Sequence, residues 1–342
     1  MLHEALWWRE ESARRVLCEL CPRLCVIPEG KAGTCGVRMN KDGRLQTAVR
    51  GLTSGCCLDP VEKKPLNHFL PGSLVLSFGT AGCNLGCIFC QNWSLSDHAK
   101  QEDLRPSTPQ DLVHAALAEE CSAVAFTYNE PAISAEFCID VAEVCHEAGL
   151  RTIAVTSGYI QGRAREDFFE VMDAANVDLK GFTEGFYQRF CGGHLAPVLE
   201  TLEYVAHEKR TWLEITTLLI PGANDDTDEV RDLSAWIAKH LGAGVPLHFS
   251  AFHPDHRLTD ASPTPIATLR RAREIAMGEG LQFVYLGNVQ DREGSTTYCP
   301  RCRKPVILRQ GFRVLENLIQ EGTCALCGAD VPGVFEKQHL QD

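Results

Sequence analysis

The stretch of sequence that decides the fold is Cys83-Asn84-Leu85-Gly86-Cys87-Ile88-Phe89-Cys90, which follows the short apolar run 74–79. It places three thiols at C-x3-C-x2-C spacing on one tight loop. Three thiolates so placed can hold three irons of a cubane iron–sulfur cluster, which normally takes four cysteines. We therefore predict that Cys83, Cys87 and Cys90 ligate a [4Fe–4S] cluster. Its fourth iron would keep an open position, as the metal does in catalytic rather than structural sites.

The composition is that of an ordinary globular protein, with 342 residues, 44% hydrophobic and 23% charged. This length allows two or more domains. No run approaches the roughly 18 apolar residues of a membrane span, and the first residues lack an apolar signal segment, so we expect no membrane association. Most of the 17 cysteines fall in C-x2-C or C-x3-C groups. Such groups predict metal sites in a reducing cytoplasm rather than a disulfide scaffold.

The net charge of −12 is concentrated in the middle of the chain, where residues 71–295 hold 32 acidic against 16 basic residues. Non-specific affinity for nucleic acid depends on neutralising phosphates with cations. We therefore expect that nucleic acid is not the main partner.

Residues 71–295 alternate between apolar, β-rich runs and helical patterns. Strands are expected at 74–79, 123–128, 151–156, 176–180, 212–219, 246–252 and 282–289. This alternation favours a parallel sheet buried on both faces, in a barrel or a doubly wound sheet. We expect a cysteine-bearing accessory segment over 1–70, the α/β domain over 71–295 and a small module over 296–342.

Polar residues follow the expected strands, and in α/β barrels the reactive groups lie at the carboxyl ends of the strands. The candidates at these ends are Asn129, Glu130, Ser157, Asp178, Lys180 and His248. Together with the cysteine loop, they predict one mouth that a cofactor fills. His248 is a candidate for contact with the cofactor or the substrate.

The cysteine loop resembles the motif of the radical S-adenosylmethionine (SAM) superfamily, C-x3-C-x-aromatic-C, with Phe89 as the aromatic residue. Across 71–295 the chain is similar to enzymes related to pyruvate formate-lyase activating enzyme. The resemblance implies a partial (β/α)6-type barrel with SAM and a [4Fe–4S] cluster as cofactors. It also implies an electron donor such as flavodoxin or ferredoxin, and reductive cleavage of SAM to a 5′-deoxyadenosyl radical that abstracts hydrogen.

The resemblance also implies roles for single residues. The segment 127–131 stands where many relatives have Gly-Gly-Glu-Pro, but both glycines are replaced here. Glu130 and the backbone beside it, at Asn129, would receive the SAM ammonium, Phe89 would line the adenine pocket and Ser157 would approach the ribose. Asp178-Leu179-Lys180 matches an Asp-Leu-Lys motif of activating enzymes.

The family that the chain resembles over nearly its full length is the AmmeMemoRadiSam system radical SAM enzyme. The residues that carry this resemblance are 59–66, Gln91-Asn92-Trp93 and the cysteine groups at both ends. It implies Memo-like or AMMECR-like pathway partners. The substrate would be a protein or a small molecule. As an alternative, the chain would activate a glycyl-radical enzyme.

Two further cysteine groups flank the α/β domain. The C-terminal one, Cys299, Cys302, Cys324 and Cys327, has the spacing of a four-cysteine zinc ribbon. The N-terminal one, Cys18, Cys21, Cys25 and Cys35, is compatible with zinc, a second iron–sulfur cluster or no metal. Cys191 precedes Gly192-Gly193, and as a thiol near a radical site it is a candidate catalytic hydrogen donor, with an inert buried thiol as the alternative.

Two other classes of function compete with a radical enzyme. A zinc-dependent hydrolase on an α/β barrel would need ligand spacings of the HExxH type, which the sequence lacks. A non-catalytic iron–sulfur or zinc adaptor would leave Phe89, Glu130 and the polar strand ends without a purpose.

Overall fold

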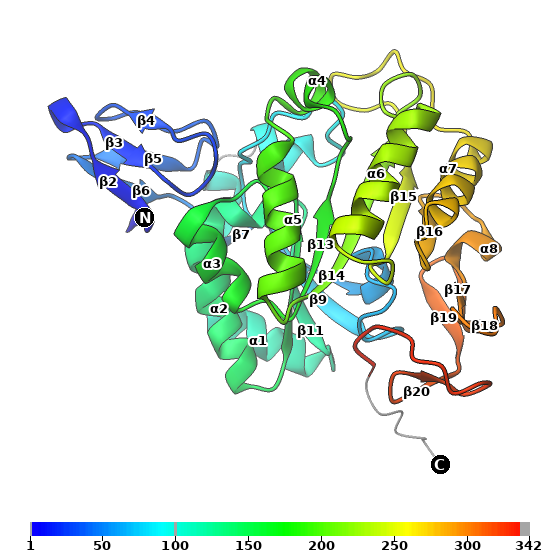
Figure 1. The fold of residues 1–342 in the computed structure, drawn as a ribbon. Helices are drawn as coiled ribbons and strands as arrows, with labels where there is room; N and C mark the ends of the chain where they lie inside the picture. The colour runs from blue at the N-terminus through cyan, green and yellow to red at the C-terminus, as the bar shows by residue number, and fades with distance from the viewer. Residues whose placement is uncertain (1, 99–100, 336–342) are drawn as a thin grey trace.

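A computed structural model describes residues 2–98 and 101–335 (Figure 1). Its centre is an eight-stranded sheet in the order β16-β15-β14-β13-β12-β11-β9-β8. The seven strands from β9 to β16 are parallel, and β8 is antiparallel to β9. The strands are β8 (Cys56–Pro60), β9 (Leu74–Phe78), β11 (Ala123–Phe126), β12 (Arg151–Thr156), β13 (Ala174–Asp178), β14 (Trp212–Leu219), β15 (Leu247–Ala251) and β16 (Val284–Gly287). The predicted α/β class and its parallel sheet are therefore confirmed.

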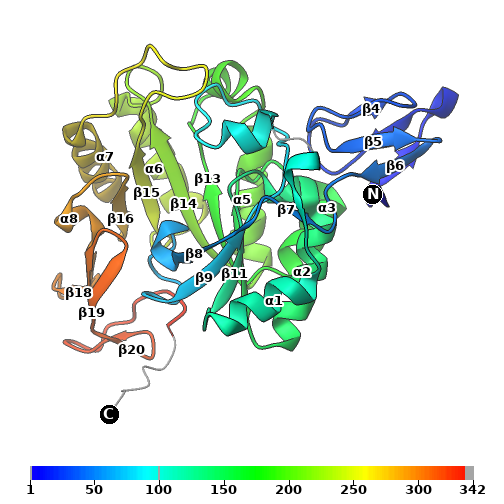
Figure 2. The same ribbon diagram turned by 180° about the vertical axis from the view of Figure 1, so that it is seen from behind.

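Long helices connect the parallel strands. They are α1 (Pro109–Ala118), α2 (Ala135–Glu147), α3 (Gly162–Glu170), α5 (Ala196–Glu208), α6 (Thr227–His240) and α7 (Ile266–Gly278). The sequence sets the start of α1, where Thr108 and Asp111 form a capping box around Pro109. Helices α5 and α6 lie in front of the sheet in Figure 1, whereas Figure 2 looks onto the other face, with β8 and β9 in front. A doubly wound sheet would carry helices on both faces and does not match this arrangement.

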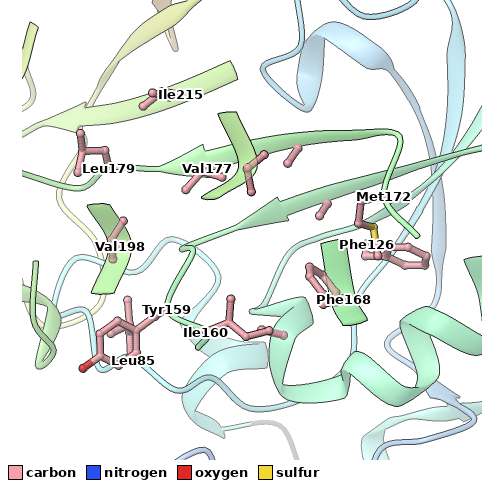
Figure 3. Close-up of a cluster of buried hydrophobic side chains, with 14 of the residues drawn as sticks. Leu85, Phe126, Tyr159, Ile160, Phe168, Met172, Val177, Leu179, Val198 and Ile215 are labelled. Atoms are coloured by element: carbon pink, nitrogen blue, oxygen red, sulfur yellow. The ribbon is translucent and has the colours of Figure 1, made fainter. Parts of the chain in front are cut away.

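The helix-facing side of the sheet forms the main hydrophobic core (Figure 3). Phe126, Val177 and Ile215 reach it from β11, β13 and β14, and Phe168 and Val198 reach it from α3 and α5. All five side chains are at most 1% exposed. Because side chains alternate across a strand, the next residues along each strand face the opposite side, where the sheet carries its polar groups.

The opposite face is closed at the amino ends of the strands by residues 61–70, which we call the plug. Val61, Leu66 and Phe69 of the plug pack on small sheet residues, among them Ala123 and Ala125. Polar contacts fix its position: Glu214 of β14 accepts hydrogen bonds from the backbone amides of Asn67 and His68, at 2.9 and 2.7 Å. The plug thus covers this face of the sheet at the amino ends of the strands and leaves it open at their carboxyl ends.

Within the described residues, the hydrogen bonds of the sheet begin at β16 and end at β8, so the sheet does not close on itself. The segment expected as a separate leader, 1–70, contributes both the edge strand β8 and the plug. Its earlier residues form small antiparallel sheets with β1 (His3–Glu4), β2 (Trp8–Glu10), β3 (Val16–Cys18), β4 (Val26–Ile27), β5 (Arg38–Lys41) and β6 (Arg44–Thr47). Two short strands, β7 (Leu52–Thr53) and β10 (Arg105–Pro106), pair with each other.

The C-terminal module follows the short helix α8 (Arg292–Ser295). Its strands are β17 (Thr297–Tyr298), β18 (Pro305–Gln310), β19 (Arg313–Asn317), β20 (Ile319–Gln320) and β21 (Thr323–Cys324). Residues 336–342 of the region predicted as this module lie outside the described residues. Among the described helices, none is both long and apolar enough to cross a bilayer.

Candidate active site

A cavity of about 300 Å³ lies at the carboxyl ends of the parallel strands. The residues that line it include three cysteines and six of the seven predicted cofactor residues. They are Cys83, Cys87, Cys90, Phe89, Asn129, Glu130, Ser157, Asp178 and Lys180. Residues 127–130 follow β11, Ser157 follows β12 and Asp178 ends β13, so the parallel strands bring these groups together. The structure thus brings most of the predicted site into one place, at the end of the sheet where α/β barrels carry their reactive groups.

The loop that carries the three cysteines is held by backbone contacts to distant segments. The amides of Gly86 and Ile88 donate to the carbonyls of Cys191 and Phe190, at 2.8 and 2.9 Å. The side chain of Asn129 donates to the carbonyl of Gly82 at 2.8 Å, and its Oδ1 accepts from the amide of Thr80. Asn129 therefore braces the start of the cysteine loop and also lines the cavity.

Gly79, at the end of β9, allows this approach. A Cβ there would lie 2.7 Å from the carbonyl oxygen of Thr127 and 3.0 Å from Oδ1 of Asn129. Only glycine lets the first strand turn into the cysteine loop this close to β11.

The thiol set fits a [4Fe–4S] cluster with an open position. Cys83, Cys87 and Cys90 are the cysteines among the described residues that line the cavity. In the described chain their three sulfurs do not all lie within 4.8 Å of one another, unlike those of the C-terminal group. Nearby, Oγ1 of Thr216 lines the cavity, is buried and has no hydrogen-bond partner within the described chain. Such an atom is suited to a ligand that brings its own polar groups.

Glu130 lies in the cavity wall and is held by several hydrogen bonds. Its Oε2 accepts from the amide and the hydroxyl of Ser157, at 2.7 and 2.6 Å. Its Oε1 accepts from Oγ1 of Thr156 at 2.5 Å and from the amide of Ala132 at 3.0 Å. The carboxylate thus already accepts four hydrogen bonds and orients Ser157, which sequence reasoning did not foresee. Its expected contact with the SAM ammonium stays a prediction.

Lys180 supplies a fixed positive charge beside the cysteine loop. Its Nζ lies 2.8 Å from Oδ2 of Asp178. Burial disfavours the charged form, but the Asp178 carboxylate and the thiols of Cys87 and Cys191 outweigh it, so the pKa of Lys180 is raised well above its ordinary value. A cation held here can offset the negative charge of thiolate ligands or of a bound carboxylate.

Two predicted site residues do not reach the cavity. His248 of β15 is buried one layer lower, where its Nε2 lies 2.7 Å from Oε2 of Glu214 and its ring stacks on Tyr285. Cys191 is fully buried beside Cys87 and does not line the cavity in the described structure. Both residues follow or lie on the expected strands, but side-chain layer and direction cannot be read from that position alone.

The structure adds lining residues from two loops that the sequence reasoning did not assign to the site. Trp93 and His256 line the cavity with their rings stacked, 5.6 Å between centroids, and the indole Nε1 donates to Asp255 at 3.0 Å. Arg257 also lines the cavity, and its amide donates to the carbonyl of Ile88 at 3.0 Å. An aromatic residue directly after the cysteine loop and a His-Arg pair after the sixth parallel strand were the available signals.

The C-terminal cysteines form a compact group. The ligand sulfurs of Cys299, Cys302, Cys324 and Cys327 all lie within 4.8 Å of one another. Two of the distances are 3.5 Å, between Cys299 and Cys327, and 4.0 Å, between Cys302 and Cys324. Tetrahedral zinc with Zn–S bonds of about 2.3 Å holds its sulfurs about 3.8 Å apart. The four residues can therefore bind one metal ion.

Comparisons with known proteins agree with the site. The family model described as the radical SAM superfamily matches residues 78–234. An uncharacterized protein of Methanocaldococcus jannaschii is 38% identical over 333 residues, which cover 96% of this chain and 99% of that protein. A pyruvate formate-lyase-activating enzyme of Clostridium pasteurianum is 25% identical over 160 residues, 45% of this chain and 65% of the relative.

Among solved structures, a radical SAM methyltransferase from Sphaerobacter thermophilus is similar in fold. It shares 15% sequence identity and a TM-score of 0.51, over 64% of this chain and 67% of that chain. A likeness at this level of identity concerns the fold alone. The family implies a [4Fe–4S] cluster and SAM, and the three cysteines that line the cavity fit both. The chain therefore belongs to the radical SAM superfamily and is an enzyme of that superfamily.

Proposed function

We propose that the chain cleaves SAM reductively at a cluster on Cys83, Cys87 and Cys90 and uses the product radical on a substrate in the same cavity. The observation that carries the proposal is the lining of one cavity by three cysteines together with Phe89, Glu130, Ser157 and Lys180. When bound, the cluster and SAM supply an electron and a 5′-deoxyadenosyl group able to abstract hydrogen. The sheet does not close on itself and its helices lie on one face, which supports describing the α/β domain as a partial barrel.

The residues of the cavity would orient SAM rather than react with it. Phe89 is 4% exposed and its ring centroid lies 6.1 Å from that of Phe186, so it offers a rigid apolar wall for the adenine. Ser157, held by Glu130 through its amide and hydroxyl, would approach the ribose. Asp178 and Lys180 lie at the end of the neighbouring strand and would contact the polar end of SAM.

Anaerobic reconstitution with iron and sulfide tests this proposal. The reconstituted chain, given SAM and a low-potential reductant, should form 5′-deoxyadenosine. Alanine variants of Cys83, Cys87 and Cys90 should not. Product formation that persists in all three variants would contradict the proposal.

Two classes of substrate are compatible with this chemistry. The activating-enzyme relatives, at 25% identity, support hydrogen abstraction from a glycine of a partner protein. The resemblance to AmmeMemoRadiSam enzymes instead supports modification of a protein or a small molecule in a pathway with Memo-like or AMMECR-like partners. Either reaction needs a one-electron donor of the flavodoxin or ferredoxin class. A glycine-centred doublet in electron paramagnetic resonance after incubation with a partner protein would support the first reaction, and turnover without a stable protein radical would support the second.

We further propose that the C-terminal group binds zinc, because its sulfur distances of 3.5 and 4.0 Å bracket the tetrahedral value of about 3.8 Å. The four cysteines pack near Phe283 and Tyr285 at the start of β16 and do not line the cavity in the described structure, which supports a structural role. Metal analysis of the full chain should give about one zinc per chain that is lost in the Cys324→Ser variant.

A further inference from the structure

The four leader cysteines surround one small cavity. Cys18 ends β3, Cys21 and Cys25 lie in the turn between β3 and β4, and Cys35 lies just before β5. All four line the cavity. Sequence distance alone does not require this convergence, because Cys35 follows Cys25 by ten residues and reaches the cavity from a different hairpin.

Backbone amides point at three of these sulfurs. The amides of Leu20, Arg23 and Val37 donate to Cys18, Cys21 and Cys35, each two residues after its cysteine. The same spacing recurs in the two cysteine groups already described, as between Leu85 and Cys83, at 3.4 Å, and between Lys304 and Cys302. These amides favour the thiolate, but burial, the larger influence, raises the pKa of all three thiols.

Cysteines of the hydrophobic core are surrounded differently. At Cys121 and Cys145, burial and then a neighbouring carboxylate raise the pKa, and neither influence favours a thiolate. Burial is the largest influence at the leader cysteines as well, and what sets them apart from Cys121 and Cys145 is the backbone amide beside each of Cys18, Cys21 and Cys35.

A buried cation also faces the cavity. Arg38 is 1% exposed, lines the cavity and pairs with Glu136 through Nη1 at 2.9 and 3.0 Å. Its Nε has no hydrogen-bond partner within the described chain. Oδ1 of Asn84, which lines the same cavity and is 1% exposed, is likewise buried and unpartnered within the described residues. Buried polar atoms left free around four thiols point to a ligand that carries charge.

The spacing of the sulfurs distinguishes a cluster from zinc. Tetrahedral zinc draws four sulfurs to about 3.8 Å from one another, as in the C-terminal group. In the described chain the leader cysteines are not among the groups whose ligand atoms lie within 4.8 Å of one another, and neither are Cys83, Cys87 and Cys90. In this respect the leader group resembles the cluster loop and differs from the C-terminal group.

The leader group is packed directly on that loop. The side chain of Asn84, the residue after Cys83, lies beside Cys21 and lines the same cavity. Nε of Arg23 donates to the carbonyl of Asn84 at 2.5 Å, and its Nη2 donates to the carbonyl of Gly192. A Cβ at Gly82 would collide with the carbonyl of Cys35. A metal centre in the leader would therefore adjoin the centre at Cys83.

We propose that Cys18, Cys21, Cys25 and Cys35 hold a second [4Fe–4S] cluster that relays electrons to the cluster at Cys83, Cys87 and Cys90. Four protein ligands leave no open iron, so this cluster would not bind SAM. A donor of the flavodoxin or ferredoxin class reduces it by one electron. It returns to its oxidised state as that electron passes to the open cluster, and no atom is transferred. The relay rests on the proposed function, whereas the metal site does not.

Iron analysis of the full chain after anaerobic reconstitution tests the site. We expect about eight irons per chain in the unaltered protein and about four in the Cys21→Ser variant. The triple variant Cys83→Ala, Cys87→Ala, Cys90→Ala should also keep about four irons, in a cluster whose paramagnetic resonance spectrum does not change on adding SAM. Cys121→Ser is the matched control and should keep the full iron content.

Each other result decides against the cluster. About four irons in the unaltered chain, with one zinc lost in Cys21→Ser, would assign zinc to the leader. If the unaltered chain and the Cys21→Ser variant contain the same amount of iron and the same amount of zinc, the leader binds no metal. An iron-free triple variant would also overturn the proposal. Because these readouts count metal, they remain decisive if the unaltered protein fails to cleave SAM.

The relay has its own test. With a flavodoxin-type donor, Cys21→Ser should form 5′-deoxyadenosine about tenfold more slowly than the unaltered chain. With dithionite, a small reductant that can reach the open cluster directly, the two proteins should react at similar rates. Equal rates with the protein donor would leave the second cluster without a relay role and so overturn that part of the proposal.

Discussion

The cysteine loop at 83–90 lines the cavity at the carboxyl ends of the parallel strands, whereas the C-terminal four-cysteine group packs with Phe283 and Tyr285 at the start of β16. The two groups use the same side chain differently. In the C-terminal group the four sulfurs lie within 4.8 Å of one another, and Cys299 and Cys324 are at most 1% exposed. In the loop three sulfurs are spread along the wall of a cavity of about 300 Å³. The number and spacing of the sulfurs, rather than the presence of cysteine, separates a site that can hold a structural ion from one that leaves a metal accessible.

The strongest test of this comparison is the Cys87→Ala variant. Loss of one of three ligands should reduce SAM cleavage to the background rate, because no other cysteine of the described chain lines the cavity. The fold should remain, since the loop is held by backbone hydrogen bonds from Gly86 and Ile88. The measurement is 5′-deoxyadenosine formation, with far-ultraviolet circular dichroism as the check on folding.

Cys138→Ser is the matched control for this change. Cys138 is fully buried on α2, and this burial raises its pKa well above the ordinary value of a thiol. Cys138 does not line the cavity and is not part of the C-terminal group, so its variant should keep SAM cleavage. Equal loss of cleavage in both variants would mean that the effect is not specific to the loop.

The C-terminal group should respond in the opposite way to Cys324→Ala. We expect loss of about one zinc per chain and unfolding of the module, because structural zinc contributes about 10–16 kcal/mol to the folding of zinc-finger peptides. SAM cleavage should fall by less than about tenfold, since none of the described residues of the module lines the cavity. If SAM cleavage in this variant fell to the background rate, the C-terminal group would be needed for cleavage as the cysteine loop is, and the two sites would not differ in role.

The sequence predicted the parallel strands and both cysteine groups because these depend on local patterns. Alternation of apolar runs and helices requires a parallel sheet, and the strand ends must then meet at one edge. Glu130, Ser157 and Lys180 lie far apart along the chain, yet this rule is enough to predict that they share one mouth.

Features that depend on which layer a side chain occupies could not be predicted. His248 lies on a predicted strand, but it faces Glu214 beneath the cavity rather than the cavity itself. The plug could not be located either, because its position depends on small residues such as Ala123 and Ala125, which pattern alone does not mark as contact sites. The same limit applied to Trp93 and His256, which meet only when two distant loops converge.

The Glu130→Gln variant tests how much the Glu130 carboxylate contributes to SAM binding. The neutral amide keeps the shape of the carboxylate but must turn its NH₂ group toward a donor, so the hydrogen bonds from Ser157 or from Thr156 and Ala132 are weakened. A charge-assisted hydrogen bond contributes about 1.5–3 kcal/mol, so the Kd for SAM should rise by about one to two powers of ten. Calorimetric titration of the reconstituted variant measures this.

Ser157→Ala and the double variant separate two roles for Glu130. If Glu130 acts through Ser157, the double variant should bind SAM no more weakly than Glu130→Gln alone, because the two changes remove one interaction. If Glu130 contacts the ammonium itself, the two effects on Kd should add.

The smallest expected effect is a pH dependence of stability at the closed end of the sheet. His68 of the plug lies between Oη of Tyr285 and the carbonyl of Pro332, each at 2.6 Å, and so joins the plug to the C-terminal module. Burial lowers its pKa from 6.5 to about 4, against the opposing charge of Glu214. The folded protein therefore keeps His68 neutral at a pH where the unfolded chain takes up a proton.

Stability should accordingly be intact above pH 6.5 and fall as the pH drops toward about 4, by up to about 3 kcal/mol. Urea unfolding at a series of pH values measures the loss. His68→Gln keeps hydrogen-bonding groups but does not titrate, so its free energy of unfolding should be lower at neutral pH and decline less between pH 6.5 and about 4.5. Parallel pH profiles for the two proteins would mean that other groups cause the decline, such as Glu214, which accepts a hydrogen bond from the amide of His68. In that case protonation of His68 would not contribute to the loss of stability at low pH.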